Sequence, residues 1–542
     1  MVPRTFMKRC ILLISLLVAR LSLAETPPNI LFILCDDLGT GDVRLLNPEG
    51  KIATPNMDRI GREGMIFTDA HTPSSVCTPT RYGTLTGRYN WRTKLQKGVL
   101  GGLSPRLIEE GRMTVASMLK EKGYHTAAVG KWHLGMNWVI KPGQTVSELT
   151  IESREQAWSV DFTQPHTQGP QSVGFDHYFG ISASLDMVPY CFIEGDRVTA
   201  QPTEDREIEM IQGSDKKGFT RKGPAAPGFT GYEVLSTFID QAISWISGKA
   251  ADAKKGRPFF LYLPLASPHT PILPNPQWRG KSGLNQYGDF VMETDAEIGR
   301  LLRALDEQGL AENTLLIFTS DNGCSPSADY PELLAKGHNP SGRYRGHKAD
   351  IYEGGHRVPF LVRWPAKVKP GQTTRQLTCL TDFMATAAEV SGFSLPAQAA
   401  EDSFSFLPTL LGKPASGAQR ESLVSHSIGG YFALREGPWK LCLCPGSGGW
   451  SEPRPGKEPA GSPEVQLFNL DEDLGETRNL QAEHPERVAQ MRQKLEAIVA
   501  KGRSTPGADQ PNAVPVDLWK KNAAAKAPKA GKGGKAKAKA VN

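Results

Sequence analysis

Short apolar runs that alternate with helical patterns are the feature that most constrains the fold of this chain. The runs occupy Asn29 to Cys35, His125 to Gly130, Phe259 to Leu263, Thr314 to Thr319 and Val358 to Trp364. Strands of a parallel sheet are buried on both faces, so they read as continuous apolar runs. With helices between them, the runs predict an α/β fold, in which a large, mostly parallel sheet is sandwiched by helices.

Helix signals lie between these strands. Thr114 is a suitable N-cap for a helix that ends before Gly123, and Glu233 to Ser247 has a helical pattern. A further helix that ends before Gly309 is predicted from an apolar stripe at helical spacing, formed by Val291, Ile298, Leu301, Leu302 and Leu305.

Polar side chains stand directly after four of the predicted strands. They are Asp36-Asp37, Lys131-Trp132-His133, Ser267-Pro268-His269 and Asp321-Asn322-Gly323. In an open α/β sheet the carboxyl ends of the parallel strands form the crevice where ligands bind. Segments far apart in the sequence are therefore expected to meet there.

The side chains of this expected crevice suit a cation and an anion together. Carboxylate and amide oxygens are the ligands that Ca²⁺ or Mg²⁺ prefers, whereas an excess of cationic groups suits an anion whose charge is spread over several oxygens. Taken singly, an Asp pair after a strand is more often a turn or a helix cap, and a lone His is more often structural. Their joint placement favours a site, with oxygen ligands from Asp36, Asp37, Asp321 and Asn322 and cationic groups from Arg81, Lys131, His133, His269 and Lys348.

One short motif adds a nucleophile. Cys77-Thr78-Pro79-Thr80-Arg81 is followed by Leu85-Thr86-Gly87-Arg88. A buried structural cysteine is the ordinary alternative. A thiol phosphatase would need about five residues between its cysteine and arginine so that backbone N–H groups can surround the phosphate. Only three residues intervene here, which disfavours that enzyme class.

The chain resembles the type I, formylglycine-dependent, arylsulfatase-like sulfatases of the alkaline phosphatase superfamily. The resemblance runs from about residue 29 to about residue 480 and follows the family's order of motifs. Besides the cysteine motif, the matching segments are Asn29 to Gly39, Thr54 to Asp58, Gly130 to Gly135, Pro268 to Pro271, Ser320 to Gly323 and Lys348 ahead of Tyr352 to Gly355.

The resemblance implies that Cys77 is oxidised to formylglycine by a formylglycine-generating enzyme, and that the residue binds one calcium ion together with Asp36, Asp37, Asp321 and Asn322. It implies further roles for the cationic residues. Arg81 and Lys131 would stabilise the hydrated aldehyde and the sulfate, His133 would help to break the covalent intermediate, and His269 and Lys348 would act at the leaving group, with His269 as the acid. The expected function is hydrolysis of sulfate esters, on a sulfated carbohydrate.

Two other functions fit these residues less well. A phosphatase or phosphodiesterase of the same superfamily would want a Ser or Thr nucleophile and a second metal site, and no residues for that site are evident. An inactive carbohydrate-binding homologue would have no reason to keep the oxidation motif beside a complete catalytic set.

Four segments make up the predicted domain organisation. Residues 1–24, with basic residues before an apolar run and Ser22-Leu23-Ala24, read as a cleaved signal peptide, which predicts a secreted or periplasmic protein without stable membrane insertion. A catalytic domain is expected over 25–415 and a subdomain of antiparallel strands plus a helix over 416–505. Residues 506–542 are expected to form a disordered, Lys- and Ala-rich tail. Long loops over the crevice are expected within 137–230, and a mobile loop over 445–464.

The basic charge of the chain belongs to its ends. The formal net charge is +6, but residues 1–24 and 520–542 together carry twelve basic and no acidic residues, which leaves −6 between them. We therefore expect no nucleic-acid partner. The Lys-rich tail is expected to be solvated, with weak contact to polyanions as the alternative. Six cysteines besides Cys10 and Cys77 permit disulfides without choosing partners.

Overall fold

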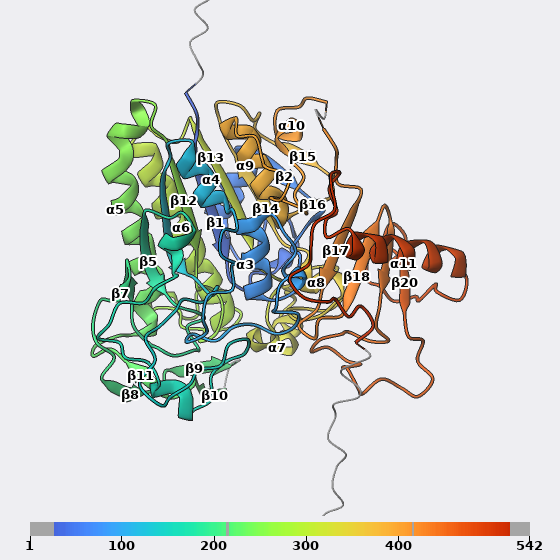
Figure 1. Ribbon diagram of the computed structural model, residues 1–542, viewed down its shortest axis with the longest axis horizontal. Coiled ribbons are helices and arrows are strands. Elements are labelled where there is room, and N and C mark those ends of the chain that lie inside the picture. The colour runs from blue at the N-terminus through green and yellow to red at the C-terminus, as the bar shows by residue number, and fades with distance from the viewer. Residues whose placement is uncertain (1–25, 213–215, 415–416, 521–542) are drawn as a thin grey trace, which may run out of the picture.

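The computed structural model describes residues 26–212, 216–414 and 417–520. A large mixed sheet forms its centre (Figure 1). In spatial order its strands are β15 (Gln372–Thr374), β2 (Met65–Phe67), β14 (Phe360–Arg363), β13 (Thr314–Ser320), β1 (Asn29–Cys35), β12 (Phe259–Pro264), β4 (His125–Lys131), β5 (His177–Ile181), β6 (Ile193–Glu194) and β7 (Arg197–Val198). The predicted α/β class is confirmed.

Helices cover both faces of this sheet. They are α2 (Pro55–Arg62), α3 (Cys77–Thr86), α4 (Val115–Glu121), α5 (Val234–Lys254), α6 (Gln286–Glu307), α7 (Tyr330–Ala335), α8 (Glu353–His356), α9 (Phe383–Ser391) and α10 (Leu407–Leu410). Short strand pairs flank the sheet: β3 (Ala70–His71) with β16 (Thr378–Cys379), β8 (Glu204–Arg206) with β11 (Gly223–Ala225), and β9 (Glu209–Gln212) with β10 (Lys216–Phe219).

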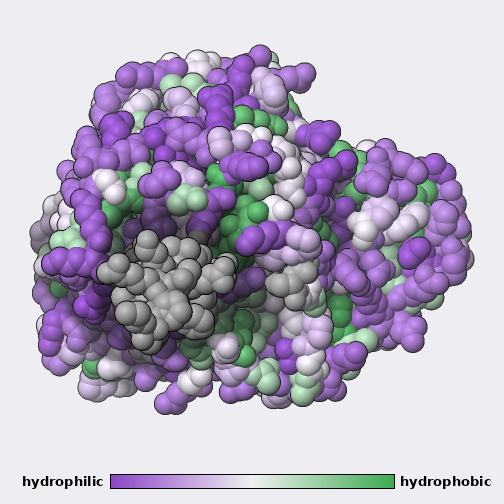
Figure 2. All heavy atoms as spheres, turned by 90° about the horizontal axis from the view of Figure 1, so that it is seen from above, coloured by the Kyte–Doolittle hydropathy of each residue, from purple (hydrophilic) through white to green (hydrophobic). Residues whose placement is uncertain are grey.

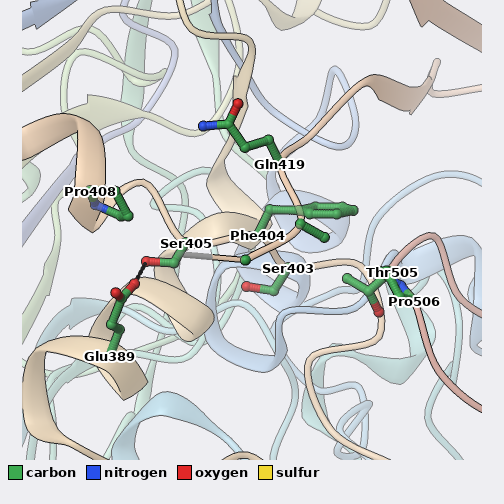
Figure 3. A pocket seen from close by; sticks show the side chains of 10 residues that line it. Glu389, Ser403, Phe404, Ser405, Pro408, Gln419, Thr505 and Pro506 are labelled. Atoms are coloured by element: carbon green, nitrogen blue, oxygen red, sulfur yellow. Dashed lines mark hydrogen bonds between the residues drawn. The ribbon is translucent and has the colours of Figure 1, made fainter. Parts of the chain in front are cut away.

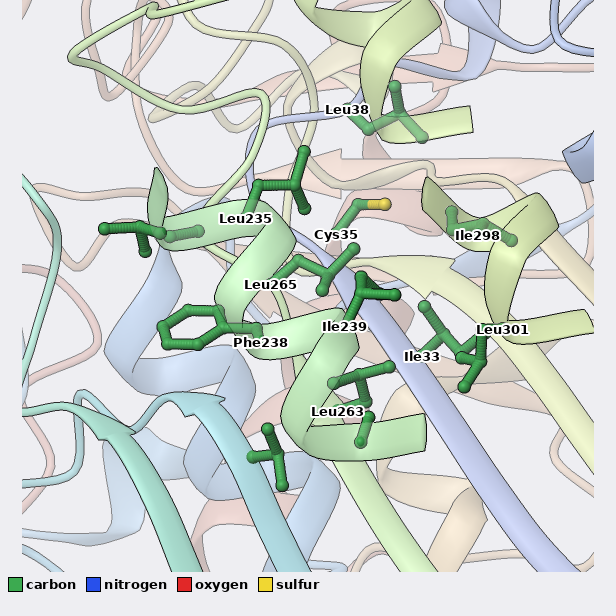
Figure 4. Packing of buried hydrophobic residues seen from close by; sticks show 14 of the residues in the cluster. Ile33, Cys35, Leu38, Leu235, Phe238, Ile239, Leu263, Leu265, Ile298 and Leu301 are labelled. Atoms are coloured by element: carbon green, nitrogen blue, oxygen red, sulfur yellow. The ribbon is translucent and has the colours of Figure 1, made fainter. Parts of the chain in front are cut away.

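Strand β1 supplies both halves of the core because successive side chains of a strand point to opposite faces. Leu31, Ile33 and Cys35 pack with α5 and α6 on one face, and Ile30, Phe32 and Leu34 pack with α3, α4 and α9 on the other. Figure 4 shows the first face, where Phe238 and Ile239 of α5 and Ile298 and Leu301 of α6 meet the strands. Every residue of β1 is buried, as its continuous apolar run predicts.

The smaller sheet lies beside the large one (Figure 1). It is antiparallel, and its strands are β17 (Ser422–His426), β18 (Phe432–Glu436), β19 (Trp439–Cys442) and β20 (Gln466–Asn469), followed by α11 (Pro485–Ala500). This sheet and helix were predicted from the sequence, although β17 was not.

Three local predictions need correction. Residues 177–181, expected in a loop, form β5, which pairs in parallel with β4. Helix α5 continues past Ser247 to Lys254 because Ala250 and Ala253 add buried positions to its inner face. Residues 506–520, expected in the disordered tail, pack on the folded body: Ala513 N–H donates to Arg92 O at 2.8 Å, and Leu518 is buried.

The remaining predictions concern the ends of the chain, the cysteines and membrane insertion. The signal peptide and the lysines beyond residue 520 lie outside the described residues. Within those residues, all seven cysteines are buried and none forms a disulfide. None of the described helices has both the length and the hydrophobicity needed to cross a bilayer. The face of the molecule in Figure 2 is mainly hydrophilic, with hydrophobic residues scattered over it.

Candidate active site

The acidic residues predicted to form a crevice meet at one edge of the large sheet. Strands β1 and β13 are parallel neighbours, and the register pairs Cys35 with Ser320. The residues that follow the two strands are therefore adjacent, and the backbone N–H of Asp37 donates to Asp321 Oδ1 at 3.3 Å. Asp36, Asp37 and Asp321 are at most 1% exposed.

Cys77 begins helix α3 beside these acids. Its Sγ lies 3.7 Å from Asp36 Oδ1, and the side chain is buried. Burial raises the pKa of the Cys77 thiol to about 12, against the lowering effect of Lys131 and Lys348. Because the thiolate is the reactive form of cysteine, an unmodified Cys77 would be a poor nucleophile at neutral pH.

Each acid of the crevice has a cationic partner. Arg81, one turn along α3 from Cys77, pairs with Asp321 Oδ2 at 2.7 Å and donates to Lys131 O at 3.0 Å. The Lys131 ammonium contacts Asp36 Oδ2. Lys348 Nζ lies 2.7 Å from Asp37 Oδ1. The buried charges thus balance locally, which is how buried charges are tolerated.

This crowding drives the pKa values of two acids apart. Burial alone would raise the pKa of Asp36, but Lys131, His269 and Arg81 together hold it well below its usual range. Burial and repulsion from Asp36 raise the pKa of Asp321 to about 6, against the effect of Arg81. Such opposed shifts of neighbouring carboxyls are typical of functional sites.

Two histidines complete the crevice, and one ring nitrogen of each is hydrogen-bonded to a backbone carbonyl. His133 Nε2 donates to Leu100 O at 2.9 Å, which leaves the buried Nδ1 without a hydrogen-bond partner. Burial, with the charge of Lys131, holds the pKa of His133 well below its usual range, so the ring is neutral. His269 Nδ1 donates to Thr270 O at 2.6 Å, and its Nε2 lies 3.6 Å from Asp37 Oδ2.

Exposure separates the two sides of the crevice. Lys131 and His133 are 0% exposed, whereas His269 and Lys348 are 7% and 6% exposed. The latter pair therefore lies nearer to the solvent, on the side from which a substrate would enter.

Backbone strain gathers at the same place. Asp37 and His133 have φ values of 65° and 55°, in the left-handed region that non-glycine residues seldom occupy. Each costs about 1–3 kcal/mol, and such residues cluster at functional sites. Gly130, just before Lys131, has φ 133°, and a Cβ there would lie 2.0 Å from Pro264 O, so only glycine fits between the strands.

The donor set fits a hard cation. Ligand atoms of Asp36, Asp37, Cys77 and His269 all lie within 4.8 Å of one another. The buried Oδ1 of Asn322 has no hydrogen-bond partner, while its Nδ2 donates to Asp37 Oδ1 at 2.7 Å. An unpaired buried carbonyl oxygen beside carboxylates suits a cation that prefers oxygen ligands.

Every residue proposed for the site from the sequence is brought together in this crevice. Asp350 was missed, because a single Asp two residues after Lys348 gives no pattern; its carboxylate accepts hydrogen bonds from a loop of the small sheet. A separate cavity of about 260 Å³ lies at α9 and α10, where Ser405 donates to Glu389 (Figure 3). None of the candidate site residues lines that cavity.

Comparison with known proteins agrees with this geometry. The family profile described as Sulfatase matches residues 28–393. An N-acetylgalactosamine-6-O-sulfatase from Bacteroides thetaiotaomicron is 35% identical over 501 residues, which cover 87% of this chain and 93% of that protein. Human arylsulfatase A is 33% identical over 442 residues, 79% of this chain and 77% of that protein.

A solved structure gives the same result. It comes from work on the metabolism of multiple glycosaminoglycans by Bacteroides thetaiotaomicron, is 33% identical and superposes with a TM-score of 0.73 over 88% of this chain and 99% of that one. The family profile, the relatives and the solved structure agree with one another. The chain therefore belongs to the type I sulfatases of the alkaline phosphatase superfamily, enzymes that hydrolyse sulfate esters.

Proposed function

We propose that this sulfatase acts on a sulfated carbohydrate, with Cys77 oxidised to formylglycine as its nucleophile and one calcium ion at Asp36, Asp37, Asp321 and Asn322. The observation that carries the proposal is the place of Cys77. It heads α3 within the oxidation motif, 3.7 Å from Asp36 Oδ1, and burial holds its thiol protonated. A cysteine that is a poor thiolate, yet lies at the centre of a charged crevice, is suited to modification.

Attack on sulfur begins at residue 77. One hydroxyl of the hydrated aldehyde gives up its proton, for which Asp36 Oδ1 is well placed, and its oxygen bonds to sulfur. The bond between sulfur and the ester oxygen breaks. Arg81, Lys131 and Lys348 stabilise the charge on the sulfate oxygens, as preorganised cations do in a buried site. Calcium, when bound, would add a further positive charge there.

The leaving oxygen is protonated on the exposed side of the crevice. His269 holds its Nδ1–H on Thr270 O, so Nε2 is the atom that carries the transferred proton. This nitrogen lies 3.6 Å from Asp37 Oδ2. A substrate whose alcohol faces the solvent would place its ester oxygen near His269 and Lys348.

The second hydroxyl completes the cycle. His133 Nδ1, buried and without a partner, is free to accept its proton. The C=O bond then re-forms, the bond from that carbon to the sulfate oxygen breaks, and sulfate leaves. Water adds to the aldehyde and restores the hydrate. Serine or threonine has no second hydroxyl on the same carbon and could not release sulfate in this way.

Among sulfated carbohydrates, N-acetylgalactosamine 6-sulfate is the first to test. The relative with 35% identity, which covers most of both chains, is named for that sugar. We also propose that a formylglycine-generating enzyme acts on the chain during maturation and that the protein is exported to the periplasm or the medium.

The test is release of sulfate and phosphate from matched aryl esters, by protein coexpressed with a formylglycine-generating enzyme. We expect sulfate release to need calcium and to fall by at least about 10³-fold in Cys77→Ala, since a covalent nucleophile is lost. The oxidation of Cys77 is read separately by mass spectrometry. Dominant phosphate release, or sulfate release that survives Cys77→Ala, would contradict the proposal.

A further inference from the structure

An exposed tryptophan lies in the loop between β19 and β20. Trp450 is 38% exposed, although the three residues before it, Ser447 to Gly449, are all buried. Large exposed aromatic side chains are uncommon because apolar surface in water costs about 25 cal/mol per Å². None of the ring-stacking or cation–π contacts among the described residues involves Trp450.

The backbone that carries Trp450 is held firmly. Asp350 Oδ1 accepts hydrogen bonds from Trp450 N–H at 2.8 Å and Ser451 N–H at 2.9 Å. Ser447 O accepts one from Ile351 N–H at 2.7 Å, and Ser447 Oγ donates to Ser451 O at 2.6 Å. The segment predicted to be mobile is thus fixed at this end, and it presents the indole from a preorganised backbone.

The anchoring residue belongs to the segment that carries Lys348. Lys348 N–H donates to Cys324 O, and Ala349 N–H donates to Ser75 O, both at 2.9 Å. Ser75 lies two residues before Cys77. Asp350, which holds the backbone of Trp450, therefore lies two residues after a cationic residue of the crevice, in a segment bonded to the chain just before Cys77.

Close backbone approach confirms this placement. A Cβ on Gly449 would lie 2.3 Å from Ala349 O, so only glycine lets the loop reach this segment. Ala349 itself has φ 80°, the third strained non-glycine residue at the crevice. The residue next to Gly449 is Trp450, so the loop that carries this tryptophan packs on residues 349 and 350, directly after Lys348.

An exposed indole on a fixed backbone can bind a sugar ring by stacking. Its face is apolar and carries negative charge density, which attracts the weakly positive C–H groups on one face of a pyranose ring. Aromatic side chains fixed in this way lose little conformational freedom when a ligand stacks on them. A charged ligand group would instead have recruited the cationic side chains found deeper in the crevice.

We infer that Trp450 forms a subsite for the sugar that adjoins the sulfated one, so that the small sheet supplies part of the substrate-binding surface. This inference rests on the proposed function, because it takes the leaving alcohol to be part of an oligosaccharide. Trp450 binds the neighbouring ring and touches neither sulfur nor the ester oxygen. Its contribution therefore appears with substrates of two or more sugars and vanishes with a single one.

The experiment compares substrates that differ only beyond the sulfated sugar. The enzyme with formylglycine at position 77 is given a chondroitin 6-sulfate oligosaccharide that ends in N-acetylgalactosamine 6-sulfate, free N-acetylgalactosamine 6-sulfate, and 4-nitrophenyl sulfate. In Trp450→Ala we expect KM for the oligosaccharide to rise about tenfold, with kcat changed less than twofold. The constants for the two small substrates should stay within twofold of wild type.

Trp450→Phe is the matched variant, since it keeps an aromatic face. It should restore KM for the oligosaccharide to within about threefold of wild type. An unchanged KM in Trp450→Ala, or an equal loss with all three substrates, would overturn the subsite while leaving the sulfatase proposal intact. If the wild-type enzyme cleaves 4-nitrophenyl sulfate but neither carbohydrate, the proposal of a carbohydrate substrate is wrong, and the subsite with it.

Discussion

The crevice around Cys77 and the cluster around Lys440 are built from the same kinds of side chain, yet they differ in what occupies their centre. In the cluster, Lys440 Nζ of β19 lies 3.0 Å from Glu353 Oε1 of α8 and 2.8 Å from Glu476 Oε1, and it contacts His356 Nε2 at 3.1 Å. A lysine ammonium thus already fills the position that a cation would take. The acids of the crevice are also paired with cationic side chains, but two neighbouring polar atoms, Asn322 Oδ1 and His133 Nδ1, have no partner there.

This comparison shows which observations distinguish a functional site from a structural cluster of buried charges. Ligand atoms of His71, Glu353 and His356 lie as close together as those of Asp36, Asp37, Cys77 and His269. Proximity of acids and histidines therefore does not distinguish a site from a structural cluster. Left-handed backbone does not distinguish them either, because Glu476 of the cluster has φ 50°. The distinguishing atoms are Asn322 Oδ1 and His133 Nδ1, which have neither a hydrogen bond nor an ion pair, whereas Glu476 Oε1 lies 2.8 Å from the Lys440 ammonium.

The largest expected effect is on stability, at the cluster. Lys440→Met removes the cation shared by two buried acids, and breaking a buried pair in this way costs about 3–5 kcal/mol. We expect the free energy of unfolding, measured by denaturant titration, to fall by that amount, while kcat of the protein that remains folded changes little.

Arg478→Ala is the control for this variant. It breaks an exposed pair with Glu483 at 2.7 Å, for which we expect a loss below about 0.5 kcal/mol. Equal losses in the two variants would show that the buried ion pairs of Lys440 contribute no more to stability than an exposed pair.

The next effect is on catalysis, at the crevice. Lys348→Met removes one cation from the sulfate oxygens, and the loss of one such group costs roughly 10²-fold in kcat. Sulfate release from an aryl ester measures this loss. Lys336→Met, which removes a lysine paired with Glu332 at 2.8 Å on α7, should leave kcat unchanged. A loss of unfolding free energy without a loss of kcat would place Lys348 with the structural cluster instead.

The smallest effect concerns His426, a buried histidine of the small sheet that contacts the segment before Cys77. It is buried in β17, and its Nδ1 lies 3.0 Å from Ser74 Oγ, near Cys77. Burial, with the charge of Lys520, lowers the pKa of His426 to about 4. In the unfolded chain the pKa of a histidine is about 6.5, so between these two pKa values the unfolded state binds a proton that the folded state does not bind. The contribution of neutral, buried His426 to the free energy of unfolding is therefore complete above pH 6.5 and is lost as the pH falls toward 4.

The expected loss at pH 5 is about 2 kcal/mol, from a difference of roughly 1.5 pKa units. Unfolding free energies of wild type and His426→Gln at pH 7 and pH 5 measure it, and the variant should lose about 2 kcal/mol less on acidification. His484→Gln, at a partly exposed histidine, serves as control. An identical pH dependence in His426→Gln and wild type would refute this assignment.

Much of the fold could be predicted because it depends on local pattern. Strand β1 has the predicted bounds, and Thr114 caps α4 by accepting a hydrogen bond from Ser117 N–H at 3.1 Å. Strand β5 could not be found in this way. Its sequence, His177 to Ile181, follows a loop-like segment, and only pairing with β4 makes it a strand. Strand β14 was found, but its antiparallel direction depends on its neighbours β13 and β2.

Position directly after a strand was enough to place seven residues at one edge of the sheet, because parallel strands end there: Asp36, Asp37, Lys131, His133, His269, Asp321 and Asn322. Cys77, Arg81 and Lys348 follow no predicted strand and were found from motifs that resemble those of the family. Only the tertiary structure decided how these residues pair, for example Lys131 with Asp36. It also decided the raised pKa of Cys77 and the ion pairs of Lys440 in the other cluster. It also decided that Asp350 holds the backbone of Trp450. Charge pairing and burial depend on distances between residues hundreds of positions apart, and no local pattern in the chain encodes those distances.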